Sequence, residues 1–128
     1  MSYYFSKTVD LPFDEAADRA RAVITEHGFG VLTEIDVSAT LRKKIGADLP
    51  PYLILGACNP KMAYQAIQAE DKIGLMLPCN IIVQQKEDGK VDVSGIDPIA
   101  SMQAVKNDAL EGTAVHVRAM MKEIIEAM

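Results

Sequence analysis

Residues 52–58 constrain the fold of this chain more than any other segment. They form a strongly apolar run that lies between Pro50-Pro51 and Asn59-Pro60. Proline disrupts the interior of a helix, so a short apolar run bounded in this way predicts a buried β-strand. Asn59 followed by Pro60 is typical of an N-cap and the first residue of a helix. The segment therefore predicts a strand that leads directly into a helix.

The other elements follow from periodicity and turn signals. Glu87-Asp88-Gly89-Lys90 predicts a hairpin turn, and Asp97-Pro98 repeats the cap-plus-proline signal before a short helical turn. Asp108 and Glu111 fit a capping box at the start of the last helix. Further strands are predicted over residues 3–10, 31–37, 75–85 and 91–96. Helices are predicted over residues 13–28, 38–44 (capped by Ser38), 60–71 and 108–128.

The last helix has an apolar seam, which is a row of apolar residues at spacings of three and four. Such a seam packs against a core or a partner. Its members are Leu110, Ala114, Val117, Met121, Ile124 and Met128.

This order, β-α-β-β-α-β-β-α, is typical of the α+β fold class. We expect two layers, with one mixed or antiparallel sheet and the long helices on one face. The helix after Pro60 would then run back over the sheet to a parallel strand. The length of 128 residues and a hydrophobic fraction of 49% suit a single domain over residues 1–128.

Composition and charge exclude several classes of function. A formal net charge of −5 would be repelled by a phosphate backbone, so we expect no nucleic-acid partner. The chain begins without a basic, apolar leader, and its longest apolar run is too short to cross a bilayer, so we expect no membrane association. Two cysteines do not make a disulfide framework. We therefore expect a cytoplasmic protein.

Cys58 is the first candidate for chemistry. It ends a predicted strand just before a helix N-terminus, where free amides and the helix dipole favour a thiolate or an anionic ligand. Lys61 would add positive charge, and Asn59 could contribute an amide or only cap the helix. The structural alternative is a buried cysteine beside an ordinary helix start.

Cys79 and Asn80 form the second cysteine-asparagine pair. By alternation Cys79 shares a face with Ile81 and Val83, which favours a buried structural role, whereas Asn80 lies on the opposite face. Cys58 is expected on the face opposite to Cys79, so no disulfide between them is expected. Neither pair has the spacing of a metal site, so we expect no bound metal, and no cofactor is identified.

Three acidic residues complete the candidates. In the strand over residues 31–37, Glu34 and Asp36 share one face about 7 Å apart, opposite Val31, Thr33 and Ile35. Paired carboxylates can bind a hard cation or act as acid and base, but they are also common on the wet side of a sheet. Asp97, at a strand end before Pro98, is either a helix cap or a site residue.

Four segments together resemble the family named domain of unknown function 302. They are GFGVLTEIDV at residues 28–37, LGACNP at 55–60, GLMLPCN at 74–80 and IDP at 96–98. The resemblance implies a small two-layer α+β fold, often dimeric, in prokaryotic proteins, and it implies no particular activity. It also makes motif positions of Glu34, Asp36, Cys58, Asn59, Pro60, Pro78, Cys79, Asn80, Asp97 and Pro98.

Three hypotheses for the function follow. The first is a homodimeric binding module for a small anionic ligand near Cys58, Asn59 and Lys61. The second is a thiol-dependent or redox enzyme, which requires a Cys58 thiol with a lowered pKa. The third is a non-catalytic interaction protein in which the cysteine-asparagine motifs serve only the fold. We expect a homodimer because the uncovered sheet face would expose an apolar patch with Tyr52 and Ile54.

Overall fold

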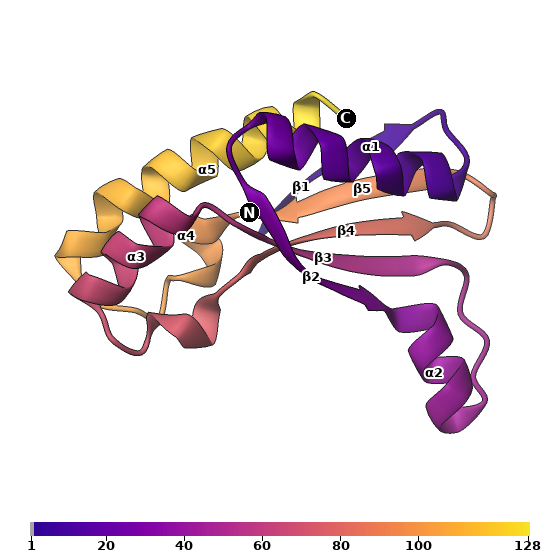
Figure 1. Cartoon of the computed structure of the whole chain (residues 1–128), viewed down its shortest axis with the longest axis horizontal. Coiled ribbons are helices and arrows are strands. Elements are labelled where there is room, and N and C mark those ends of the chain that lie inside the picture. The colour runs from indigo at the N-terminus through magenta and orange to yellow at the C-terminus, as the bar shows by residue number, and fades with distance from the viewer. Residues whose placement is uncertain (1) are drawn as a thin grey trace.

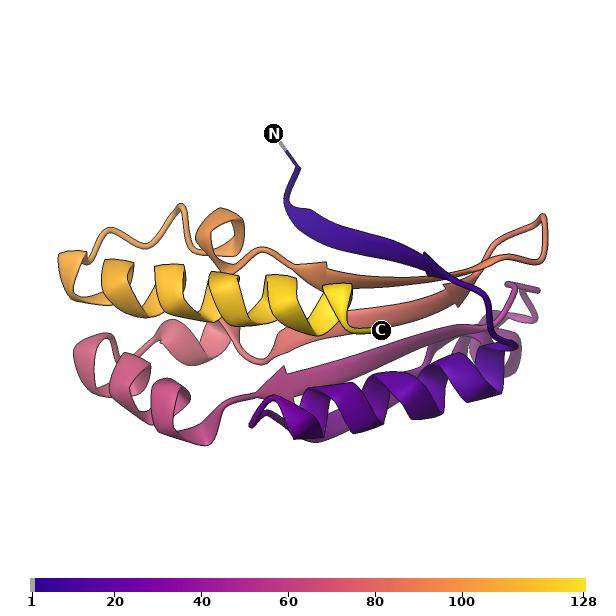
Figure 2. The same cartoon turned by 90° about the horizontal axis from the view of Figure 1, so that it is seen from above.

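The computed structural model describes residues 2–128, and one five-stranded sheet organises them. Its strand order is β1-β5-β4-β3-β2, and every neighbouring pair is antiparallel. The strands are β1 (Tyr4–Val9), β2 (Gly30–Asp36), β3 (Tyr52–Cys58), β4 (Cys79–Gln85) and β5 (Val91–Ile96). The helices α1 (Phe13–Glu26) and α5 (Glu111–Glu126) lie on one face of the sheet (Figures 1 and 2). The predicted α+β fold with one helix-covered face is confirmed.

The main core lies between the sheet and these two helices. Leu55, Ile81 and Val93 point from the central strands toward Ile24 of α1 and Met121 of α5, and all five are almost fully buried. The predicted seam is correct from Ala114 to Ile124, whose seam residues lie in α5 and are buried. Leu110 is buried just before α5, and Met128 follows α5 half-buried. The seam therefore contributes to the core of this chain and is not left for a partner.

The helix α3 (Pro60–Ala69) corrects one expectation. Because β3 and β4 are antiparallel neighbours, the connection between them needs no crossover, and α3 continues past the end of the sheet (Figure 1). There it meets the 3-10 turns η1 (Ile73–Met76) and η2 (Asp108–Leu110), near α4 (Pro98–Ser101). Ala66, Ile73 and Leu110 form a second small core in this lobe.

The predicted strand over residues 75–85 begins late, at Cys79. Residues Ile73–Met76 form the turn η1 instead, and Leu75 is exposed. The physical reason is Pro78, which has no N–H to donate to a ladder and restricts the residue before it. The strand therefore starts only after the proline, which places Cys79 at its first position.

Two predicted helix starts are also wrong, by one to three residues. The helix α2 (Val37–Ile45) is capped by Asp36, whose carboxylate accepts from the amide of Ala39 at 2.9 Å, and not by Ser38. Ser38 instead donates to the carbonyl of Pro50. Near α5, Asn107 rather than Asp108 supplies the cap, and it caps the turn η2 that precedes the helix. Each cap residue lies one or two positions before the one predicted, within the usual error of helix boundaries.

A β-bulge changes the facing of β2. Val31 pairs with Ala57 but Thr33 pairs with Gly56, so Leu32 is an extra residue in the strand. The extra residue reverses the alternation, so Val31 packs against the core while Thr33 and Ile35 lie on the open face of the sheet. The prediction that these three residues share one face is therefore wrong.

Candidate functional site

The two cysteine-asparagine motifs meet at one end of the sheet. Ala57 and Cys79 are direct cross-strand partners, so Cys58 lies one residue from the position opposite Cys79. Both cysteines line the same partly enclosed cavity, of about 40 Å³. The expectation that they lie far apart is wrong because β3 and β4 are antiparallel neighbours, so the end of β3 adjoins the start of β4. The expectation of opposite faces rested on strand alternation. However, β3 ends at Cys58, where the chain turns into α3 and strict alternation no longer sets the side-chain direction. Both cysteines are free thiols.

The walls of this cavity come from segments that are far apart in the sequence. α3 contributes Met62 and Ala63, α5 contributes Ala114 and Val117, and Met102 follows α4. Four sulfur-containing residues line this space, which we call the sulfur-lined cavity: Cys58, Cys79, Met62 and Met102. Apart from the thiols, only Asn59 and Thr113 bring polar side chains to its lining.

The size of the sulfur-lined cavity limits what it can hold. By the same measure of volume, a cavity needs about 10–15 Å³ to accept one water molecule. A volume of about 40 Å³ therefore has room for a ligand of roughly two to four non-hydrogen atoms. Pockets for metabolites and cofactors are several times larger. Cys58, Met62 and Met102 are half-buried, so they lie where the cavity meets solvent.

The N-terminus of α3 is less available to an anion than the sequence suggested. The side-chain oxygen of Asn59 accepts from the amide of Met62 at 3.2 Å, so the helix is capped from within the chain. Lys61 is exposed and does not line the cavity. The positive charge expected beside Cys58 is therefore not directed at it.

The electrostatic environment of the two thiols is the reverse of that of an activated cysteine. Burial raises the pKa of Cys58 above its ordinary value. Burial, with a smaller contribution from nearby Cys58, raises the pKa of Cys79 to about 11. Both thiols are therefore protonated near neutral pH, whereas a cysteine nucleophile needs a lowered pKa.

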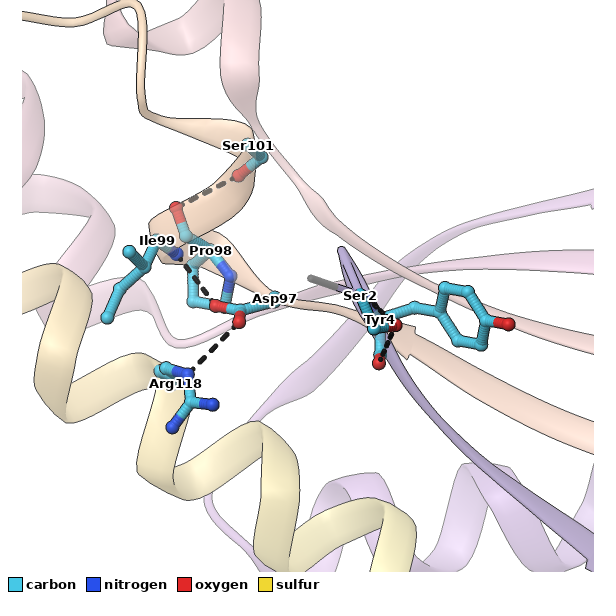
Figure 3. A network of polar contacts seen from close by, with 7 residues as sticks. All are labelled: Ser2, Tyr4, Asp97, Pro98, Ile99, Ser101 and Arg118. Carbon is cyan, nitrogen blue, oxygen red and sulfur yellow. Dashed lines mark hydrogen bonds and ion pairs between the residues drawn. The ribbon is translucent and has the colours of Figure 1, made fainter.

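Asp97 does not line the cavity but lies next to Pro98, which does. It is only 7% exposed, and its two carboxylate oxygens accept from the amide of Ile99 at 3.0 Å and from Nε of Arg118 at 3.0 Å (Figure 3). The guanidinium of Arg118 also lies 5.1 Å from the centre of the Phe5 ring. Asp97 thus joins the start of α4 to α5 and holds Pro98, which lines the cavity, against α5.

The remaining candidates lie elsewhere in structural roles. Glu34 faces α1 and forms a two-point contact with Arg21, at 2.7 and 2.9 Å, which lowers the pKa of Glu34. Asp36 caps α2. Asn80 lies on the open face of the sheet, away from the cavity. The structure therefore brings together Cys58, Asn59 and Cys79, but not the others.

Met62 and Met102 are lining residues that the sequence analysis missed. Met62 follows Cys58 by only four residues, in the first turn of the helix that the motif begins. That spacing is a local signal that could have identified it. Met102 has no such signal, because it reaches the cavity through the tertiary packing of α4 beside α5.

These features define a two-layer α+β domain with an apolar, sulfur-lined cavity at the end of its sheet. The sequence matches the family described as Domain of unknown function DUF302 over residues 5–128. The chain therefore belongs to the DUF302 family.

A solved structure shows the same fold. It is described as the crystal structure of uncharacterized conserved protein DUF302 from Bacillus stearothermophilus. The two chains share 24% sequence identity, with a TM-score of 0.91 over 99% of this chain and 98% of the other. The search of curated proteins returned no match. Within residues 2–128, no helix has the length and apolar character needed to cross a membrane.

Proposed function

We propose that this protein is a binding module for a ligand of only a few atoms, held in the sulfur-lined cavity. The observation that carries the proposal is the convergence of both cysteine-asparagine motifs on one apolar space. A fold gains nothing in stability from an unfilled space, because wall atoms without neighbours lose their dispersion contacts. A cavity of about 40 Å³ lined by two thiols therefore points to a site rather than to efficient packing.

The cavity favours an apolar or soft ligand over the small anion expected from the sequence. Its lining is mostly apolar and has few hydrogen-bond donors, and Lys61 does not line it. An anion placed there would lose its hydration without compensation, at a cost of several kcal/mol or more. The raised pKa values of both cysteines also argue against the alternative of a thiol-dependent enzyme.

Xenon tests this proposal because it is a small, soft probe that enters apolar cavities. The measurement is NMR of protein labelled with carbon-13 at the methionine methyl groups, under increasing xenon pressure. We expect the signals of Met62 and Met102 to shift in a saturable manner. Met76 lies in η1 outside the cavity lining and serves as the internal control.

An Ala114→Leu variant should abolish these shifts, because the added carbons occupy the same space. Circular dichroism confirms that the variant is folded, and Ala63→Leu is a second variant that fills the cavity from α3. Saturable xenon shifts that persist in both folded variants, or none in the unmodified protein, would contradict the proposal.

The open face of the sheet supports a further part of the proposal, namely that two copies of this chain pair through it. Ile35, Ile54 and Ile82 form an apolar row across β2, β3 and β4. Tyr4 and Tyr52 lie at the margins of the same face, and Ile35 is 48% exposed. A face of this kind can pair with a second copy of itself across a twofold axis.

The size of this face suggests a weak homodimer. Strands of this length, in a sheet of five strands, span roughly 20 Å by 20 Å. The projected area of roughly 400 Å² is about half of the ~800 Å² that each partner buries in a standard interface. We therefore expect association at micromolar concentrations, measured by sedimentation as a species of twice the 13.9 kDa chain mass. Ile82→Lys should give a monomer, and a monomer of the unmodified chain at high micromolar concentration would contradict the proposal.

A further inference from the structure

The sulfur-lined cavity has a chemistry more specific than its shape. Two cysteines, Cys58 and Cys79, and two methionines, Met62 and Met102, line it from three different segments of the chain. Thiolate and thioether sulfur are soft ligands, which select Cu(I) over hard cations such as Mg²⁺ or Ca²⁺. We propose that the cavity binds one soft monovalent cation, Cu(I), through these four sulfur atoms. This inference rests on the proposed function and names the class of its ligand.

The fold places the two cysteines close enough for a shared ligand. Cys79 is the direct partner of Ala57, and residues in such a pair have Cα atoms about 4.5–5.5 Å apart. Cys58 is the next residue along β3. Met62 then lies in the first turn of α3, where the cap by Asn59 fixes the backbone amide of Met62 itself. Three of the four sulfur ligands are thus held by one strand pair and one capped helix start.

The volume of the cavity agrees with a single ion. About 40 Å³ accommodates one cation among sulfur atoms but excludes a haem or an organic cofactor. The half-buried positions of Cys58, Met62 and Met102 give the ion a path from solvent. The site is therefore partly shielded from water, yet it can be reached.

Charge balance explains why thiols are needed beside thioethers. A monovalent cation held only by neutral methionine sulfur would bury a net positive charge in an apolar space, which is costly. Loss of one thiol proton gives a thiolate that cancels this charge. Binding must therefore release at least one proton, so the apparent affinity depends on pH.

The same arrangement disfavours zinc. Zn²⁺ in proteins is bound by cysteine, histidine and carboxylate ligands, usually four of them, and thioethers are not among them. Within residues 2–128, no group of three or more histidine, cysteine, aspartate or glutamate side chains could hold a metal ion. Our expectation of no metal site considered such ligands alone. Methionine sulfur adds two further ligands that suit Cu(I).

The test is an anaerobic competition between the full-length protein and bicinchoninate, a coloured chelator of Cu(I). We expect one Cu(I) per chain, with X-ray absorption showing only sulfur in the first coordination shell. The apparent affinity should rise by about tenfold per pH unit for each proton released, between pH 6 and pH 8. An affinity independent of pH, or oxygen and nitrogen in the first shell, would overturn the inference.

Variants locate the site. Cys58→Ser and Cys79→Ser should each weaken binding by more than the roughly 10- to 100-fold that loss of an outer-shell partner costs. Met62→Leu and Met102→Leu keep the shape of the wall and should each weaken binding by about tenfold. The matched control Met76→Leu lies outside the cavity and should bind normally. Unchanged binding in a folded Cys58→Ser, Cys79→Ser double variant would overturn the inference.

The xenon experiment separates this inference from the proposed function. If xenon fills the cavity but the protein takes no Cu(I) from the chelator, the copper inference is wrong and the binding module stands. If the cavity accepts neither, both proposals are wrong. If Cu(I) binds with the stated variant pattern, it should also block the xenon-induced shifts of Met62 and Met102.

Discussion

Replacing Asp97 tests how the fold secures the cavity. Asp97→Ala removes the cap of α4, which typically costs about 1 kcal/mol. It also removes the ion pair with Arg118, but the Arg118 side chain is 41% exposed, so solvent screening limits that contribution to about 0.2–1 kcal/mol. The hydrogen bond from the amide of Ile99 is the one that this cap provides, so its loss is already included in the cost of the cap. The total expected loss in the free energy of unfolding is about 1–2 kcal/mol.

Asp97→Asn should have a smaller effect. An amide has one oxygen, so it can accept from Ile99 or from Arg118 but not from both as the carboxylate does. We expect a loss of about 1 kcal/mol, measured by urea unfolding followed by circular dichroism. The control is Asp10→Ala, since exposed Asp10 makes no side-chain contact of this kind within residues 2–128. A loss for Asp97→Ala within about 0.5 kcal/mol of this control would refute the reasoning.

Three further perturbations test other parts of the structure. The free energy of unfolding should fall between about pH 9 and pH 11 by up to ~3 kcal/mol, because above pH 9 the Cys79 thiol ionises in the unfolded chain before it does in the folded one. Cys79→Ala should remove most of this slope in pH-dependent urea unfolding and leave the part that comes from the raised pKa of Cys58, and an unchanged slope would contradict the assignment. Glu34→Gln should lower the free energy of unfolding by less than about 1 kcal/mol at pH 7 and not at all well below pH 4. The pair with Arg21 lowers the pKa of Glu34, so it stabilises the fold while Glu34 is ionised and stops doing so as the pH falls and Glu34 is protonated. Equal losses at pH 3 and pH 7 would show that the ion pair is not the cause. Gly56→Ala should cost about 1–3 kcal/mol, because its new Cβ would collide with Thr33 and Pro78. Gly74→Ala, which meets open space, is the control, and equal unfolding midpoints for the two variants would show that the close packing at Gly56 does not exist.

The sequence predicted the elements well because their signals are local. Proline bounds β3, an Asp-Gly turn joins β4 to β5, and asparagine or aspartate before proline starts α3 and α4. These signals act within a few residues, so they do not depend on the rest of the fold. The errors in facing and in helix starts have equally local causes, such as the extra residue Leu32 in β2.

The strand order required information that no single segment carries. A strand, a helix and a second strand suggest a parallel crossover, and this pattern gave the wrong path for the helix after Pro60. In the structure α1 alone makes a long connection, from β1 at one edge of the sheet to β2 at the other. Once the edges are taken by these two strands, β3, β4 and β5 fill the space between them as antiparallel neighbours. The direction of β4 is therefore decided by the whole sheet.

The candidate site follows from that direction. If β3 and β4 were parallel, the end of β3 and the start of β4 would lie at opposite ends of the strands, and Cys58 and Cys79 would be separated by the length of a strand. In the antiparallel pair the end of one strand adjoins the start of the next, which brings the two motifs together. The helix α3 then begins at this same end of the strands, so Met62 in its first turn lies beside the two cysteines in the cavity lining. The two motifs that looked like separate helix and strand signals thus meet at one cavity because the sheet is antiparallel.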